Sequence, residues 1–214
     1  MNESSVGTVP TRRRVLQTLM GAGGLLVSER LPGTGASALA APWNHLRLLD
    51  LAAATTALGL TFYRHALTGS EFTLGETGTR QLESMFAAQR MDAGQVQALG
   101  GQVLIRRVQL PDSVHRDASV FVQTGLHMER ASAQFYLSAT RDLAAQNTPE
   151  ITLLLARLAA HASQRQVRLA HLAGLSGDEA VLGPVARSTP EALGALSVYL
   201  GEARDGFQPV AVSS

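Results

Sequence analysis

Apolar residues recur every three or four positions in four long segments of the chain, which is the pattern of helices that bury one face. The clearest segment is FVQTGLHMERASAQFYLSAT, residues 121–140. One stripe of it consists of Val122, Leu126, Glu129, Ala133 and Tyr136. Glu129 is the charged member of this stripe, and a carboxylate is costly to bury unless a partner satisfies it. The pattern therefore predicts a bundled helix with one ionic position in its buried face.

Start and stop signals delimit the expected helices. The first is rich in leucine and alanine and free of proline, and Gly100-Gly101 ends the second. A carboxylate cap, Asp112 or Asp117, begins the third, and Thr-Pro-Glu at residues 148–150 begins the fourth. The four helices are expected over residues 43–67, 79–99, 112 or 117 to 145, and 148–172.

The connection between the second and third helices is long. Residues 102–110 (QVLIRRVQL) have a β-like apolar pattern but no partner strand, so an extended crossover that stops at Pro111 is expected. A second Thr-Pro-Glu signal at residues 189–191 predicts a short fifth helix to residue 200, lying across one end of the bundle. The fold class is thus all-α, a four-helix bundle over residues 41–202 with the single crossover of ferritin-like connectivity. Residues 203–214 are expected to be an irregular tail.

Residues 1–40 have the layout of a cleaved export signal. A basic stretch, TRRRVLQ, precedes the apolar run LMGAGGLLV, and Ala38-Leu39-Ala40 provides a small-x-small cleavage site. The Arg12-Arg13 pair is similar to a bacterial twin-arginine signal, although an ordinary secretory signal with a chance arginine run remains an alternative. The apolar run is too short to span a bilayer comfortably, so no transmembrane anchor is expected after cleavage. The expected location is the periplasm or the cell envelope.

The amino-acid composition limits the kinds of binding and catalytic site that are expected. The 214 residues are 45% hydrophobic and 5% aromatic, as for one domain with an aliphatic core. The 18 basic residues, all arginine, nearly balance 17 acidic ones, so nucleic-acid binding is disfavoured. There is no cysteine, so a metal would need histidine, carboxylate or water as ligands. The chain has neither a Gly-x-Ser-x-Gly turn nor a Gly-x-Gly-x-x-Gly loop after a strand, which argues against triad hydrolysis and nucleotide binding.

Each long helix has one polar interruption near the middle of its apolar stripe. The interruptions are Thr56, Asp92, Glu129 and His161. Four polar positions at comparable depth predict one polar layer inside the bundle. Di-iron bundles place carboxylates and histidines in such a layer, because iron requires several inward oxygens, with imidazole nitrogens completing its coordination.

Four segments resemble the helices of an exported ferritin-like family that includes plant and bacterial desiccation-related proteins. They are LDLAAATTALGLTFY, MDAGQVQAL, LHMERASAQFYLSA and HASQRQVRLAHLAGL, and the resemblance extends over most of residues 46–175. The resemblance implies a ferritin-like bundle. The family pattern has Glu on the first and third helices and Glu-x-x-His on the second and fourth. At the matching positions this chain has Thr56, Asp92 and Gln95, Glu129, and His161 and Gln164.

One interpretation of this altered set is a single divalent ion. Asp92, Glu129 and His161 form a carboxylate, carboxylate and imidazole set suited to Fe, Mn or Zn, with Gln95 and Gln164 as weaker ligands. A working di-iron oxidase is disfavoured, since two irons need more anionic oxygen than two carboxylates supply.

The favoured interpretation is a site that binds no metal. His161, Arg165 or Arg168 would then neutralise Asp92 and Glu129 in a buried hydrogen-bonded network. An arginine fork can occupy the space between two carboxylates much as a cation does. A third interpretation is that the layer is misplaced and some of these residues face solvent.

These interpretations lead to two functional hypotheses. Without a metal, the protein would be a structural, binding or stress-protection (desiccation-related) protein of the cell envelope. With a metal on Asp92, Glu129 and His161, it would be a ferroxidase or a peroxide-consuming enzyme. A homo-oligomer or an envelope protein is a conceivable partner in either case. The sequence leaves enzymatic activity undecided and favours a non-enzymatic role, and a contact between Glu129 and Arg165 or Arg168 would support that choice.

Overall fold

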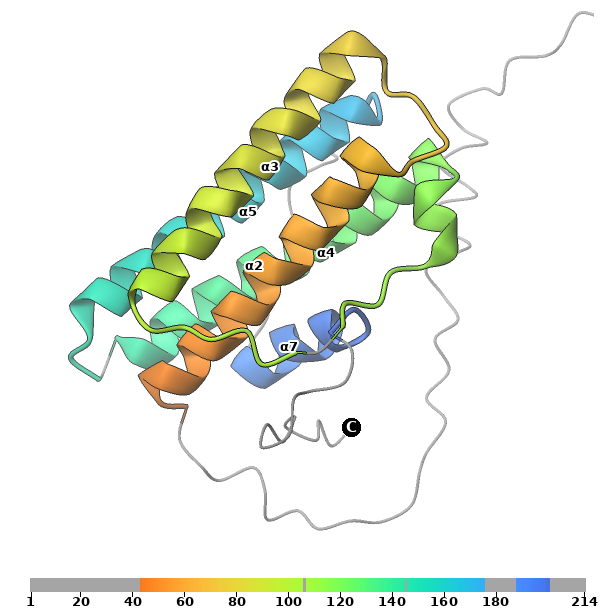
Figure 1. Ribbon diagram of the computed structural model, residues 1–214. Coiled ribbons are helices and arrows are strands. Elements are labelled where there is room, and N and C mark those ends of the chain that lie inside the picture. The colour runs from red at the N-terminus through yellow and green to blue at the C-terminus, as the bar shows by residue number, and fades with distance from the viewer. Residues whose placement is uncertain (1–42, 106, 145, 176–187, 201–214) are drawn as a thin grey trace, which may run out of the picture. The chain divides into compact units, whose positions relative to one another are not determined.

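The protein is all-helical in the part that the computed structural model describes, namely residues 43–105, 107–144, 146–175 and 188–200 (Figure 1). This confirms the predicted all-α class. The expected signal peptide and cleavage site, and the expected tail at residues 203–214, lie outside these residues. The helices are α2 (His45–Thr68), α3 (Gly75–Ala98), the 3₁₀ turn η2 (Asp112–His115), α4 (Ala118–Leu143), α5 (Pro149–Leu172) and α7 (Thr189–Ser197).

The four long helices form two packed pairs. α2 packs chiefly against α3, and α4 packs chiefly against α5, while α4 also meets α2 and α3 meets α5. The chain between α3 and α4 runs back along the bundle as a crossover (Figure 1). At one end of the crossover Gln102 N donates to Asp50 Oδ1 (2.8 Å), and at the other Glu71 N donates to His115 O (2.8 Å). The predicted extended crossover is therefore confirmed.

Local capping chemistry accounts for two of the helix starts. The Asp117 carboxylate accepts hydrogen bonds from Ser119 N (2.7 Å) and Val120 N (3.2 Å), so it begins α4. Asp112 instead begins η2. The Asn44 side chain caps α2 by accepting from Arg47 N (2.9 Å). Of the two carboxylates predicted as the α4 cap, Asp117 is thus the correct one.

Helix α3 begins at Gly75, four residues before the predicted start at Thr79. Gly75 has a φ of 67°, which suits a turn into the helix. Gly78 lies inside the helix and is buried, and a Cβ on it would come within 2.7 Å of Leu74 Cβ. The predicted start at residue 79 left both glycines out of the helix, whereas Gly78 allows close packing of its first turn.

The short helix α7 lies along the side of α4, so the prediction that it crosses one end of the bundle is wrong. Thr189, at the start of α7, has its hydroxyl 2.7 Å from Asp142 Oδ2, near the end of α4. Beyond the other end of α7, the Tyr199 hydroxyl lies 2.9 Å from His127 Nδ1, in the first half of α4. The two helices therefore run antiparallel. Thr189 was expected to cap α7, but the side chain that accepts from the helix is that of Ser188.

The crossover also contacts the end of α7. Val108 and Leu200 form an isolated antiparallel bridge, and Gln109 N donates to Tyr199 O (2.9 Å). Inside the bundle the core is aliphatic, with fully buried aromatic rings at its centre, including stacked Phe62 and Phe121 with ring centroids 4.6 Å apart. No helix in the described part of the chain is both long and apolar enough to cross a membrane.

We expect the attachment of α7 to weaken in acid. Burial, and secondarily the charge of Arg130, lowers the pKa of His127 below its usual 6.5, so the folded protein resists protonation of this ring. The contribution of His127 to stability is therefore full above about pH 6.5 and is lost as the pH falls through that value towards the lower folded-state pKa. Because the ring is partly exposed, the loss should be about 1 kcal/mol or less.

The measurement is urea unfolding of wild type and His127→Gln between pH 5 and pH 8. Glutamine can still accept from the Tyr199 hydroxyl but does not titrate. The stability difference between the two proteins should shift in favour of the variant as the pH drops. A difference that is constant with pH would contradict the assignment.

Candidate functional site

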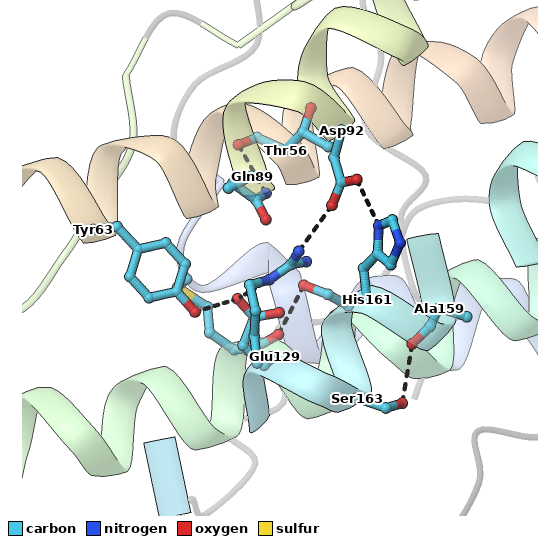
Figure 2. Close-up of polar contacts among 11 residues, drawn as sticks. Thr56, Tyr63, Gln89, Asp92, Glu129, Ala159, His161 and Ser163 are labelled. Carbon is cyan, nitrogen blue, oxygen red and sulfur yellow. Dashed lines mark hydrogen bonds and ion pairs between the residues drawn. The ribbon is translucent and has the colours of Figure 1, made fainter. Parts of the chain in front are cut away.

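The polar centre of the bundle is a buried ionic cluster held together by Arg165. Its Nη1 donates to Asp92 Oδ2 (2.8 Å), and its Nε donates to Glu129 Oε1 (3.0 Å). The guanidinium on α5 thus bridges a carboxylate on α3 and a carboxylate on α4 (Figure 2). Both bonds are charge-assisted, and each carboxylate receives one of them from a different nitrogen of the planar guanidinium.

His161 completes the environment of Asp92. Its Nδ1 lies 2.7 Å from Asp92 Oδ1, so the two oxygens of this carboxylate have different partners (Figure 2). His161 and Arg165 are four residues apart on α5 and therefore share one face of the helix. Both side chains consequently converge on the single carboxylate that α3 provides.

Tyr63 is the member of the cluster from α2. Its hydroxyl donates to Glu129 Oε1 (2.5 Å), the same oxygen that Arg165 contacts. The predicted α2 member was Thr56, and this is wrong, because the Thr56 hydroxyl donates to Ala53 O within its own helix (3.0 Å). Tyr63 follows Thr56 by two helical turns on the same stripe, and long helical side chains lean back towards the N-terminus, which brings the phenol to the polar layer.

A buried amide packs beside the cluster. Gln89 Nε2 donates to the carbonyl of Thr56 (3.1 Å), which links α3 to α2 (Figure 2). A Cβ at Gly59 would lie 2.5 Å from this nitrogen, so glycine gives the amide its space. The apolar pattern of the sequence does not reveal this contact, because its acceptor is a backbone carbonyl on another helix.

The cluster is largely cut off from water. Asp92, Glu129 and Arg165 are 1%, 2% and 3% exposed, whereas the His161 side chain is 34% exposed and forms its solvent side. Burial alone would lower the pKa of Arg165, but the negative charge of Glu129, with lesser contributions that include Asp92, raises it above its ordinary value. The guanidinium therefore remains charged. Burial, and then the charge of Glu129, raises the pKa of Tyr63, so its phenol stays a hydrogen-bond donor.

Three of the five predicted metal ligands, Asp92, Glu129 and His161, meet in this cluster. Gln164 is exposed. Gln95 has a buried Oε1 that finds no hydrogen-bond partner among the described residues. The alternative that the layer is misplaced and faces solvent therefore fails for the three principal residues, and Thr56 is buried as well, although its hydroxyl does not join the cluster.

The side chains as they lie do not fit a metal ion. Arg165 occupies the space between the two carboxylates and brings a positive charge that repels a cation. Within the described ranges, no three His, Asp or Glu side chains gather as a metal-ligand group. The cluster instead matches the predicted network in which arginine neutralises both carboxylates.

Arg168 and two further histidines lie elsewhere. Arg168, the alternative partner of the carboxylates, is exposed and donates to Ser84 Oγ (3.0 Å). His127 contacts Tyr199, and His115 packs its ring against that of His65, with centroids 4.8 Å apart. None of these contacts reaches Asp92 or Glu129, so Arg168, His127 and His115 lie outside the ionic cluster.

Two tyrosines offer a matched test of the cluster. Tyr63 and Tyr136 are both essentially fully buried, but the Tyr136 hydroxyl has no hydrogen-bond partner within the described structure. Tyr63→Phe should cost about 1.5–3 kcal/mol of unfolding free energy, because it removes a hydrogen bond to a charged group. Tyr136→Phe should change the unfolding free energy by about 0.5 kcal/mol or less, or stabilise the protein. Chemical denaturation measures both, and equal losses would show that the Tyr63 hydroxyl contributes nothing through Glu129.

Comparison with known proteins adds no identification to this geometry. No model of a known protein family, no curated protein and no solved structure matches the chain.

Proposed function

We propose that this protein is an exported, non-catalytic bundle of the ferritin-like class, in which a buried ionic cluster stands where related folds hold metal. Its role would be structural, binding or stress-protective (desiccation-related) in the cell envelope. The observation that carries the proposal is the Arg165 bridge between Asp92 and Glu129. A carboxylate pair already bound to a guanidinium has lost the coordination capacity that oxidase chemistry needs.

The chain connectivity supports the ferritin-like part of the proposal. Two antiparallel helix pairs, α2 with α3 and α4 with α5, are joined by one long crossover (Figure 1). A bundle with one long crossover is the arrangement of ferritin-like folds. The proposal of a lost metal site follows from the replacements at matching positions, with His161 and Thr56 where the family pattern has glutamate.

A core closed by its own side chains also suits an exported protein. The Arg12-Arg13 pair supports the twin-arginine route, which carries proteins that are already folded. Arg165, Asp92 and Glu129 need no cofactor to neutralise one another, so folding and export would not depend on metal supply. For a stress-protection protein of the envelope, this independence is an advantage when metals are scarce or water is lost.

The competing function is that of a ferroxidase or peroxide-consuming metalloprotein. One observation favours it, because Glu129 Oε2 is buried without a hydrogen-bond partner in the described part of the chain. That oxygen and the partly exposed His161 are coordination capacity that the arginine bridge leaves unused. Metal content therefore separates the two functions.

The test is elemental analysis of the protein secreted by its own host and purified without chelators. We expect Fe, Mn and Zn to stay far below one equivalent per chain in wild type and in Glu129→Gln. The variant should lose about 3 kcal/mol of stability, because it breaks a buried ion pair. Glu83→Gln, at an exposed position of α3, is the matched control and should behave as wild type.

One equivalent of metal in wild type that is absent from Glu129→Gln would overturn the proposal. It would assign Asp92, Glu129 and His161 to a functioning metal site and lead to oxidase and peroxidase assays.

A further inference from the structure

We infer that Arg165 is the resident cation of this site, and that removing its side chain alone converts the ionic cluster into a binding site for one divalent metal ion. The inference rests on the proposed function, because it takes the wild-type cluster to be free of metal. It goes further by assigning the exclusion of metal to one residue. The residues at positions 56, 95 and 164, which differ from the family pattern, would then not be the reason that the site excludes metal.

The charge balance of the cluster supports this assignment. Asp92 and Glu129 are both at least 98% buried and share one bridging cation, Arg165. Without the guanidinium, two carboxylates would remain in a low-dielectric core with the Tyr63 hydroxyl and His161 as their remaining partners. Two unpaired buried charges are strongly unfavourable. One divalent ion would neutralise both charges, as would protonation of the two carboxylates.

The remaining donors suit a particular class of ion. Asp92 contributes carboxylate oxygens, Glu129 contributes Oε1 and the unpartnered Oε2, and His161 contributes an imidazole nitrogen. Two carboxylates and one imidazole are a recognised ligand set for Mn²⁺, Fe²⁺, Co²⁺ and Zn²⁺. The carboxylates now stand apart by the width of a guanidinium, so the ion would have to draw them together by rotation of their side chains.

Two features of the surroundings would serve an ion bound in the absence of the Arg165 side chain. The Tyr63 hydroxyl, the α2 member of the cluster, donates to Glu129 and would orient this carboxylate as an outer hydrogen-bond partner of a metal ligand does. His161 is partly exposed while the carboxylates are not, so it marks a short path from solvent to the ligands. Truncation of Arg165 supplies the volume that the ion and its remaining water ligands would fill.

The test is titration of Arg165→Ala with Co²⁺ and Mn²⁺ on the full secreted protein. Visible absorption reports on Co²⁺ coordination, and equilibrium dialysis reports on stoichiometry. We expect one equivalent to bind at least about 100-fold more tightly than to wild type, since a unit positive charge has left the site. The melting temperature of the variant should rise on addition of metal, and that of wild type should not. Arg168→Ala removes an exposed arginine from the same helix and should match wild type.

The double variant Arg165→Ala/Glu129→Gln should not bind the metal ion, because it lacks one of the proposed carboxylate ligands. This result would locate the metal binding of Arg165→Ala in the ionic cluster. If Arg165→Ala folds only when metal is present, the inference is supported, because the ion then replaces the lost cation. Arg165→Gln, a neutral side chain with hydrogen-bonding capacity, is the second variant in case the alanine protein fails to fold.

Absence of metal uptake by both Arg165 variants, whether or not they fold, would overturn the inference. The proposed function would survive that result as long as wild-type protein carries no metal. Stoichiometric metal in the wild-type cluster would instead overturn the proposed function, so the two failures are distinguishable.

Discussion

The rest of this structure depends on one constraint, that two carboxylates buried in a helical core must share a cation. Arg165 meets it by contacting Asp92 and Glu129 with different nitrogens of one planar group. Three helices are thereby linked through their side chains, and Tyr63 adds the fourth through Glu129. Buried ion pairs are weak evidence for stability, because desolvation offsets much of the attraction. Such a network can fix register, since a slip of α3, α4 or α5 would leave a buried charge unpaired.

Packing around the cluster follows from this fixed register. Gly59 leaves space for the Gln89 amide, which ties α3 to a backbone carbonyl of α2. The crossover allows α4 to start at the same end of the bundle as α3, so that Asp92 and Glu129 come from helices that run in the same direction (Figure 1). α7 and the end of the crossover then cover the side of α4, with Thr189 and Tyr199 as attachment points. The fold thus places the charged residues inside the bundle, while α7 and the crossover cover the outer side of α4.

The ionic cluster is chemically permanent, because its cation is an amino-acid side chain. A guanidinium holds its proton under all physiological conditions, and the negative charge beside Arg165 raises its pKa further. Unlike a metal ion it cannot be lost to a chelator, exchanged for another ion or oxidised. The cost is that the carboxylates are no longer available as ligands. Under the proposed function, the outer surface of the bundle and not its interior would carry the role of the protein.

The sequence by itself determined the helices and the polar layer. Apolar periodicity located all four long helices, Asp117 and the Thr-Pro-Glu signals located starts, and a charged residue in an apolar stripe marked Glu129 as needing a partner. These features follow from local propensity and from helical geometry, which act over a few residues. The choice of Arg165 over Arg168, three positions away, was left open, because stripe position alone does not show which side chain reaches another helix. Only the tertiary structure decided that choice. It also showed that Tyr63, and not Thr56, is the α2 member of the cluster, and that α7 lies along α4. Each of these findings depends on the distance between atoms far apart in the chain.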